Sequence, residues 1–393
     1  MQALRDVTVL DLSRLLPGPF CTLLLADMGA DVIKVEDTTG GDYLRWMPPL
    51  VDQYSALFHA VNRNKRSIAL NLKTGPGRAA FLRLVERVDV VVEGFRPGVL
   101  DRLGVGYKAL LERNERVILC SVTGYGQDGP YRDRVGHDIN YAALAGVLGV
   151  TGCAEDELAV PGVQMGDFGA GGLGAAVAIL AALHERTRTG RGQHCDVAML
   201  DGLLSWMAPL AASLGDGAPS PRPGTEPLNG RHPCYRLYRC ADGYLSVGAL
   251  EPKFWQAFVE AIGLGHLGPD GLASGQRAKQ VVAEVQTRLA TRTRAAWEAV
   301  LNGHETCCEP VLSLHEVMAH PQVRWRQTGS AGSDPARRAL EGVVPFRIGD
   351  TGPTARRPAP RYGEHTREIL AGVGYDDASI EELVKEGATI DAR

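Results

Sequence analysis

The first 36 residues constrain the fold most strongly, because they contain the pattern of a β-α-β unit. Residues 7–13 (VTVLDLS) are β-branched and alternate in polarity, which is typical of a strand. Residues 17–30 (PGPFCTLLLADMGA) begin with prolines and have helical apolar spacing, and residues 31–36 (DVIKVE) are a second strand-like run. Two strands joined by a helix form a unit of a parallel sheet.

The same alternation continues along the chain. Helical stretches over 78–87 and 107–113 are interleaved with the apolar runs DVVVEGF (89–95) and VILCSVTGYG (117–126). We therefore predict an α/β fold with a doubly wound, mostly parallel sheet. The turn after the first strand, SRLLPGP, has one glycine and two prolines where a dinucleotide site requires G-x-G-x-x-G, so no such site is predicted.

A chain of 393 residues exceeds the roughly 100–200 of a usual domain, so two domains are expected. We assign residues 1–212 to a large first domain and residues 213–232, rich in Gly, Pro and Ser, to a linker. Residues 233–325 form a smaller α+β domain, with a hairpin over 234–250 and a helix over 251–263. Residues 326–393, a linker and C-terminal segment, are expected to return to the first domain.

Composition excludes several classes of protein. Lys and Arg (42) are fewer than Asp and Glu (46), so the basic excess of a nucleic-acid binder is absent. The N-terminus has no apolar signal region, and we expect a cytoplasmic protein. The longest apolar stretch, 168–183, is shorter than the roughly 18 residues that span a bilayer, so we expect a buried helix and no membrane partner.

The eight cysteines are expected to be reduced thiols. Cys307 and Cys308 lie near His304, but adjacent cysteines lack the C-x-x-C spacing of a zinc site, and no metal is predicted.

Three residues are candidates for chemistry, each with a structural alternative. Asp167 stands among glycines before the apolar helix, where it either caps the helix or is left open to a substrate. His137 is either a surface histidine or a base in a turn that faces a cleft. Glu251 either begins a helix or serves a site.

Basic residues form a second group of candidates. Residues 62–73 (NRNKRSIALNLK) surround a strand-like run with cations, and Arg96 follows another. Such charges are either solvated or, at strand ends, placed to bind phosphates. The cations in the first run are Arg63, Lys65, Arg66 and Lys73.

These stretches together resemble the class III CoA-transferase and α-methylacyl-CoA racemase superfamily (CaiB/BaiF). The motifs that carry the resemblance are DLSRLLPGPFCTLLLADMGADVIKVE, NRNKRSIALNLK, EGFRPGVLDRLG, SVTGYGQDGPY, GHDINY, GDFGAGG, TGRGQHCDVAMLD and GALEPKFW. The resemblance implies an interlocked homodimer whose chains each have a Rossmann-like large domain and a small domain. It also implies acyl-CoA thioester substrates and an active site between subunits.

Two chemistries occur in this superfamily. Transferases use the carboxylate that matches Asp167 as a nucleophile and move CoA to a free carboxylic acid through an anhydride. Racemases use the residues that match His137 and Asp167 as acid and base at the α-carbon, with Glu251 expected to bind the histidine. Backbone amides near Phe168 would stabilise the enolate.

The resemblance also implies residues that bind CoA, and it implies no cofactor beyond CoA itself. These residues are Arg96, Lys65, Arg66, Lys34 and Tyr125.

The chain departs from the racemases and from formyl-CoA transferase just before the hairpin predicted over 234–250. It reads GRHPCY where these racemases tend to read GGAPYY, and it lacks the glycine run of formyl-CoA transferase. We favour a racemase over a transferase, since a covalent transferase has no evident need for His137. A silent acyl-CoA-binding protein is the third hypothesis, and three titratable residues at motif positions argue against it.

Overall fold

The computed structural model describes residues 2–154, 157–212, 214–215, 219–327, 348 and 356–390. The chain divides into two compact units. The first comprises Met1–Ala145, Val163–Met207 and Pro321–Arg393, and the second comprises Gly146–Gly162 and Ala208–His320. Each unit has its own hydrophobic core.

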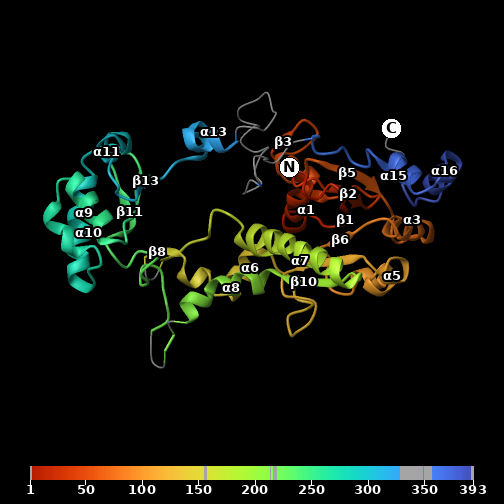
Figure 1. The fold of residues 1–393 in the computed structure, drawn as a ribbon, viewed down its shortest axis with the longest axis horizontal. Helices are drawn as coiled ribbons and strands as arrows, with labels where there is room; N and C mark the ends of the chain where they lie inside the picture. Colours follow the sequence, from red (N-terminus) through yellow and green to blue (C-terminus); the bar gives the residue numbers. More distant parts are fainter. Residues whose placement is uncertain are drawn as a thin grey trace. The chain divides into compact units, whose positions relative to one another are not determined.

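A six-stranded parallel sheet forms the centre of the first unit (Figure 1). The apolar runs become strands whose side chains are buried on both faces, as is usual in parallel sheets. The strand order is β10-β7-β6-β1-β2-β5, and the predicted α/β class with a mostly parallel sheet is confirmed. The strands are β1 (Thr8–Asp11), β2 (Asp31–Glu36), β5 (Lys65–Ala69), β6 (Val90–Glu93), β7 (Ile118–Thr123) and β10 (His194–Ala198).

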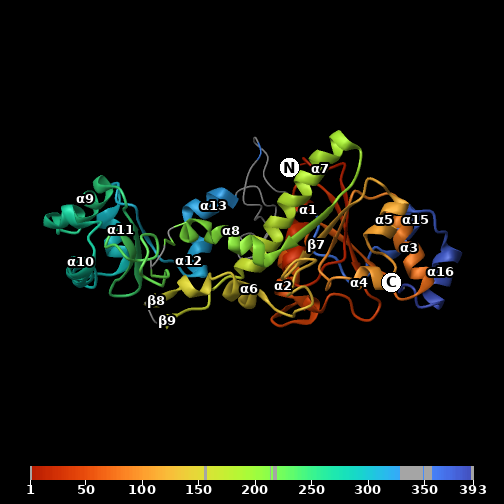
Figure 2. The same cartoon turned by 90° about the horizontal axis from the view of Figure 1, so that it is seen from below.

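Helices cover both faces of this sheet. On one face, α1 (Pro17–Asp27) and α7 (Gly174–Thr189) pack against Val9, Val90 and Val92. The opposite face, with Leu10 and Val91, is covered by helices that Figure 2 shows grouped together. These are α3 (Gly75–Val85), α5 (Tyr107–Arg113), α15 (Thr366–Gly372) and α16 (Asp377–Lys385). Segments from both ends of the chain therefore share one core.

The apolar helix differs from its prediction. The helical run covers Met165–Thr189, and its 25 residues are long and apolar enough to cross a bilayer by length and composition. The expectation that this apolar stretch falls short of the roughly 18 residues that span a bilayer was therefore wrong. It begins with a π-helical segment, η3 (Met165–Leu173), and continues as α7, whose Ala175, Ala176 and Ile179 are buried on the sheet. Because these side chains are buried against the sheet, we interpret the run as a core helix.

Shorter elements complete the first unit. They are η1 (Tyr43–Trp46), β3 (Leu50–Val51), β4 (Tyr54–Ser55), α2 (Ala56–Asn62), α4 (Val99–Arg102), α6 (Asp138–Leu144), α8 (Met199–Ala211, which extends into the second unit) and α13 (Pro321–Gln327).

The second unit contains a three-stranded antiparallel sheet, β11 (Tyr235–Arg239), β12 (Tyr244–Gly248) and β13 (Cys308–Pro310). Trp255, Phe258 and Trp297 anchor its core. Its helices are α9 (Pro252–Ala261), η4 (Gly265–Asp270), α10 (Gly275–Leu289), α11 (Arg294–Leu301) and α12 (Leu314–Ala319). The seven cysteines whose side chains are described are free thiols.

Residues 146–162 belong to the second unit, whereas the sequence analysis placed them in the first domain. They form η2 (Leu148–Val150) and the hairpin of β8 (Gly152–Ala154) and β9 (Glu157–Leu158). The reason is tertiary packing with the linker: a Cβ atom at Gly152 would lie 3.0 Å from Pro223 Cγ.

Candidate active site

His137 lies where the loop after β7 turns into α6. It occupies the N-cap position, its backbone N–H donates to Asn140 Oδ1 at 3.0 Å, and its side chain is exposed. Tyr141, one turn further along, donates its hydroxyl to the Gly136 carbonyl oxygen at 2.5 Å. The motif GHDINY therefore holds its own turn rigid and leaves the imidazole at the surface.

Asp167 lies in the first turn of the π-helix η3, beside α6. Its backbone N–H donates to Asp138 Oδ1 at 3.0 Å. Because Asp138 follows His137 in the chain, this bond joins the two segments that carry the predicted acid and base. Asp167 is not the predicted N-cap, since that position belongs to Gln164. Irregular π-helical turns are rare and often occur at functional sites.

The surroundings of Asp167 change its acidity. Burial and the nearby negative charge of Asp138 raise the pKa of the Asp167 carboxyl to about 7. Burial also raises the pKa of Tyr141 to about 12, together with Tyr125 and the two carboxylates, so its phenol stays protonated. Near neutral pH, Asp167 can therefore both accept and release a proton.

The glycines of the GDFGAGG motif do not open space for a substrate, which corrects the sequence interpretation. A Cβ atom at Gly169 would lie 2.3 Å from the Trp206 ring, and one at Gly166 would lie 2.8 Å from Asp138 Oδ1. These glycines instead allow α8 and α6 to approach η3 closely.

The amides suggested for an enolate are also already used. The Asp167 N–H donates to Asp138, and the Phe168 N–H donates to the Gln164 carbonyl oxygen at 3.0 Å. A racemase mechanism would therefore need another donor for the enolate oxygen.

Glu251 belongs to the second unit. It occupies the N-cap position of α9, its side chain is exposed, and that side chain makes no capping hydrogen bond. Its predicted contact with His137 stays a prediction.

Lys34 and Lys65 do not face a ligand, and we correct their assignment to CoA. Both side chains are fully buried. The Lys65 ammonium donates to Asp11 Oδ2 at 3.0 Å, to the Pro19 carbonyl oxygen at 2.9 Å and to Asn62 Oδ1 at 2.9 Å. Lys34 donates to the Ser13 carbonyl oxygen and pairs with Asp42. All three donors of Lys65 are therefore engaged inside the protein.

The other predicted CoA residues differ in accessibility. Arg66 is mostly buried and binds Asp31 at 2.5 Å and Glu368 at 2.8 Å. Arg96 is exposed just after β6. Tyr125 is partly buried, and its ring meets Tyr141 edge-on with 5.1 Å between centroids. Tyr125 thus contacts the GHDINY turn.

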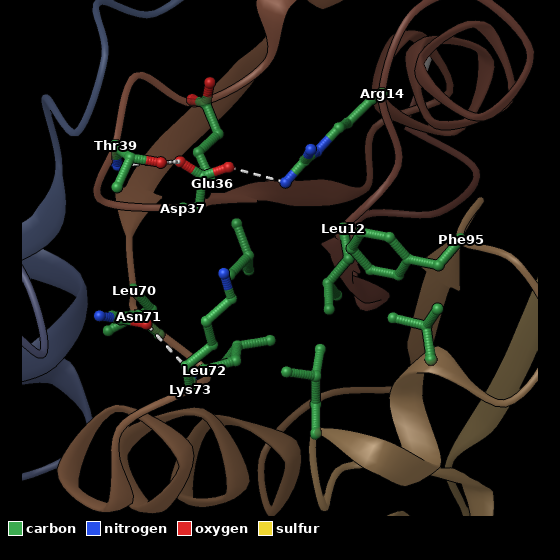
Figure 3. Close-up of a pocket in the computed structure, with 13 residues that line it drawn as sticks. Leu12, Arg14, Glu36, Asp37, Thr39, Leu70, Asn71, Leu72, Lys73 and Phe95 are labelled. Carbon is green, nitrogen blue, oxygen red and sulfur yellow. Dashed lines mark hydrogen bonds and ion pairs between the residues drawn. The ribbon is translucent and has the colours of Figure 1, made fainter.

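A cleft of about 340 Å³ opens at the carboxyl ends of β1, β2, β5 and β6 (Figure 3). Apolar side chains form most of its wall, and Arg14 and Lys73 supply positive charge. Arg14 pairs with Asp37 at 2.7 Å, and its guanidinium lies 5.6 Å from the Phe95 ring centroid. The lining residues are Leu12, Arg14, Val35, Glu36, Asp37, Thr39, Leu70, Asn71, Leu72, Lys73, Phe95, Val99 and Leu103.

The sequence analysis missed Arg14, which directly follows the predicted strand over 7–13, and Phe95, which ends the apolar run over 89–95. In parallel sheets, ligands bind outside the carboxyl ends of the strands. That rule, applied to SRLLPGP and EGFRPG, selects these two residues.

The family of the chain follows from comparison with known proteins. The model of CoA-transferase family III matches residues 4–366. The chain belongs to this family. The family III fold is also present in the crystal structure of a CaiB/BaiF family protein from Brucella suis, with a TM-score of 0.81 and 31% identity over 95% of this chain and 99% of that one.

Relatives of both predicted kinds occur among the similar proteins. An α-methylacyl-CoA racemase of Mus musculus is 35% identical over 390 residues, which cover 97% of this chain and 96% of that protein. A succinyl-CoA:glutarate CoA-transferase of Mus musculus is 35% identical over 396 residues, covering 98% and 90%. The prediction of a family III enzyme, racemase or CoA-transferase, is confirmed.

Proposed function

We propose that this family III enzyme is a 2-methylacyl-CoA racemase in which His137 and Asp167 act as the acid and base at the α-carbon. The observation that carries the proposal is the Asp167 carboxyl. Its pKa is about 7, and its segment is bonded directly to the residue that follows His137. A nucleophile must be ionised, whereas this environment favours the protonated form up to near neutral pH.

The proposed reaction conserves protons. In one direction, neutral His137 removes the α-proton, the electron pair moves onto the thioester oxygen, and protonated Asp167 delivers a proton to the opposite face. In the other direction, ionised Asp167 is the base and the imidazolium is the acid. The pair holds one proton before and after each turnover, and a pKa near the working pH suits both roles.

The enolate oxygen needs a hydrogen-bond donor. The first amides of a helix have no acceptor within the helix, and in α6 these include Asp138 and Ile139. We assign the oxyanion to this turn, because it follows His137 directly.

We propose that the cleft at the strand ends binds the adenosine and phosphates of CoA. Its residues take the role that the sequence analysis gave to Lys34 and Lys65. Its apolar wall suits the adenine ring, and the exposed Lys73 and the guanidinium of Arg14 suit phosphates. From the centre of the sheet, β1, β2 and β5 follow one another to one side and β6, β7 and β10 to the other. The order of the strands therefore reverses between β1 and β6, which supports a Rossmann-like sheet that binds its ligand at this switch point.

We further propose that the enzyme is a homodimer, as the resemblance implies. Ile139 and Leu144 of α6 are 42% and 51% exposed, and Trp206 of α8 is 49% exposed. Apolar side chains gathered beside a site are typical of a surface that another chain covers. Light scattering on a sizing column tests this assembly, and a monomer at micromolar concentration would contradict it.

The test of function is incubation with a stereopure 2-methylacyl-CoA in deuterated water, with and without added free carboxylic acids. NMR follows the α-proton, and mass spectrometry follows transfer of CoA. We expect deuterium uptake and loss of stereopurity without an acid. His137→Ala should abolish racemisation, and His184→Ala, which changes an exposed histidine on α7, should not.

Acid-dependent CoA transfer without α-proton exchange would instead identify a CoA-transferase. CoA binding with neither activity would identify a silent binding protein. Either result would overturn the racemase proposal.

A further inference from the structure

The contact between α6 and η3 has an unusual composition. Asp138 is a half-buried carboxylate that accepts the backbone N–H of a second carboxylate residue, Asp167, at 3.0 Å. The bond fixes the backbone of Asp167. The contact also places a second negative charge beside the Asp167 side chain. Like charges in one site disfavour ionisation, so Asp138 makes the Asp167 carboxyl harder to ionise.

The side chains packed on the other residues of η3 around Asp167 are mostly apolar. From α1, Phe20 packs edge-on against Phe168 with 5.1 Å between ring centroids. From α8 and its first turn, Trp206, Leu203 and Met199 fill the space that the η3 glycines leave.

The titratable side chains on this side of η3 belong to α6 and the turn before it: His137, Asp138 and Tyr141, with Tyr125 against Tyr141. Within the described residues, Asp138 is the charged group whose field raises the pKa of Asp167, after burial. In the part of the chain that the structure describes, no arginine or lysine offsets the effect of Asp138 on Asp167.

We infer that Asp138 is a positioning residue for the reaction. Its carboxylate oxygen anchors the Asp167 backbone, and its negative charge keeps in the site the one proton that His137 and Asp167 share. The inference rests on the proposed role of Asp167, and it goes beyond that role by assigning a function to the residue next to His137. The Asp138 side chain acts through Asp167, separately from the Asp138 backbone N–H that we assign to the oxyanion.

The two functions of Asp138 can be separated by substitution. Asp138→Asn keeps an oxygen that can accept the Asp167 N–H and removes the charge. Asp138→Ala removes both. Asp133→Asn is the matched control, because it removes an exposed carboxylate from the same loop, and that carboxylate is paired with Arg132.

The first measurement is kcat/KM against pH for wild type and the three variants, in whichever activity the enzyme has. Removing the Asp138 charge should move the acid limb to lower pH by about half a unit or more. The shift should appear in Asp138→Asn and Asp138→Ala and be absent from Asp133→Asn. Loss of the anchor should lower kcat about tenfold or more in Asp138→Ala relative to Asp138→Asn.

For a racemase, the profile of kcat/KM against pH must shift by the same amount whichever epimer is the substrate. The equilibrium between epimers is close to unity, so the two values of kcat/KM stay equal at every pH. An Asp138→Asn profile that superimposes on that of wild type would overturn the inference.

A second measurement does not need activity. Infrared spectra show the protonated carboxyl band of Asp167 as the band that is missing in Asp167→Asn. Its titration midpoint should fall in Asp138→Asn and stay in place in Asp133→Asn. An unshifted midpoint overturns the inference, whereas absence of α-proton exchange with a shifted midpoint overturns only the racemase proposal.

Discussion

At the scale of single residues, the acidity of Asp167 links function to stability. An ordinary aspartate has a pKa near 3.8, and in the folded protein Asp167 has a pKa of about 7 because of burial and Asp138. The folded state therefore binds more protons than the unfolded state between about pH 4 and 7. Its contribution to stability is fully present below about pH 4 and is lost as pH rises through 7.

Asp167→Asn should therefore stabilise the protein in a pH-dependent way. The variant removes the penalty for ionising a buried carboxyl, so its Tm should exceed that of wild type at pH 8 by about 2 °C or more. At pH 3.5, where Asp167 is protonated in both the folded and the unfolded state, the two proteins should melt almost together. Differential scanning calorimetry at both values tests this, and a Tm difference independent of pH would contradict the assigned acidity.

Lys65 supplies the second residue-scale prediction. Its burial lowers the pKa of its ammonium to about 8, and, although burial opposes ionisation of Asp11, Lys65 and Lys34 hold the pKa of Asp11 at about 2. Both groups are thus charged at neutral pH.

Lys65→Met leaves Asp11 with one cation fewer and should lower the free energy of unfolding by about 3–5 kcal/mol. Arg96→Gln, at an exposed side chain, should unfold as wild type does. Urea titrations give both values. A stable Lys65→Met protein with weakened CoA binding would restore the original assignment.

These residues also show the limits of sequence reasoning. The motif positions of His137 and Asp167 could be predicted because they belong to short segments with a fixed order. The burial of Lys34 and Lys65 could not, because it depends on Asp11 and Asp42, whose approach is set by strand pairing and a loop after β2. The same applies to Asp138, whose partner is 29 residues away.

At the scale of elements, the strands agree with the sequence because apolar runs and buried parallel strands correspond closely. The predicted strands over 31–36 and 89–95 became β2 (Asp31–Glu36) and β6 (Val90–Glu93). The π-helix could not be foreseen, since a run of small residues such as GAGG has no periodicity that separates π from α geometry. Its glycines are explained only by the helices packed on it.

Gly172→Ala tests that packing. A methyl group there would lie 2.7 Å from Phe20 Cδ1 and 3.0 Å from the Pro17 carbonyl oxygen, so η3 and α1 must separate. We expect a loss of about 1–3 kcal/mol in the free energy of unfolding. Gly75→Ala, at the start of α3 with no atom near its Cβ position, is the control. Equal stability of both variants would contradict the close approach.

At the scale of the whole molecule, the first unit carries both the cleft and the proposed acid and base. The cleft depends on four strands ending at one edge of the sheet, which the sequence implied only as a class of fold. Apart from Arg14 and Phe95, the side chains that reach the cleft could be named only from the strand order.

Lys73→Ala should weaken binding of free CoA about tenfold, with a smaller effect at high salt, because an exposed ammonium is screened. Lys108→Ala, an exposed lysine on α5 outside the cleft, is the matched control. Calorimetric titration measures both. Equal affinities for the two variants would place CoA elsewhere.

The central claim is that His137 and Asp167 work on opposite faces of one carbon. Deuterium incorporation from each separate epimer of a 2-methylacyl-CoA tests it most directly, in wild type, His137→Ala and Asp167→Asn. Wild type should exchange both epimers and racemise them. Each variant should lose racemisation yet still exchange the one epimer whose proton faces the remaining base, with opposite preferences. No exchange by wild type, or racemisation that survives in both variants, would contradict the account.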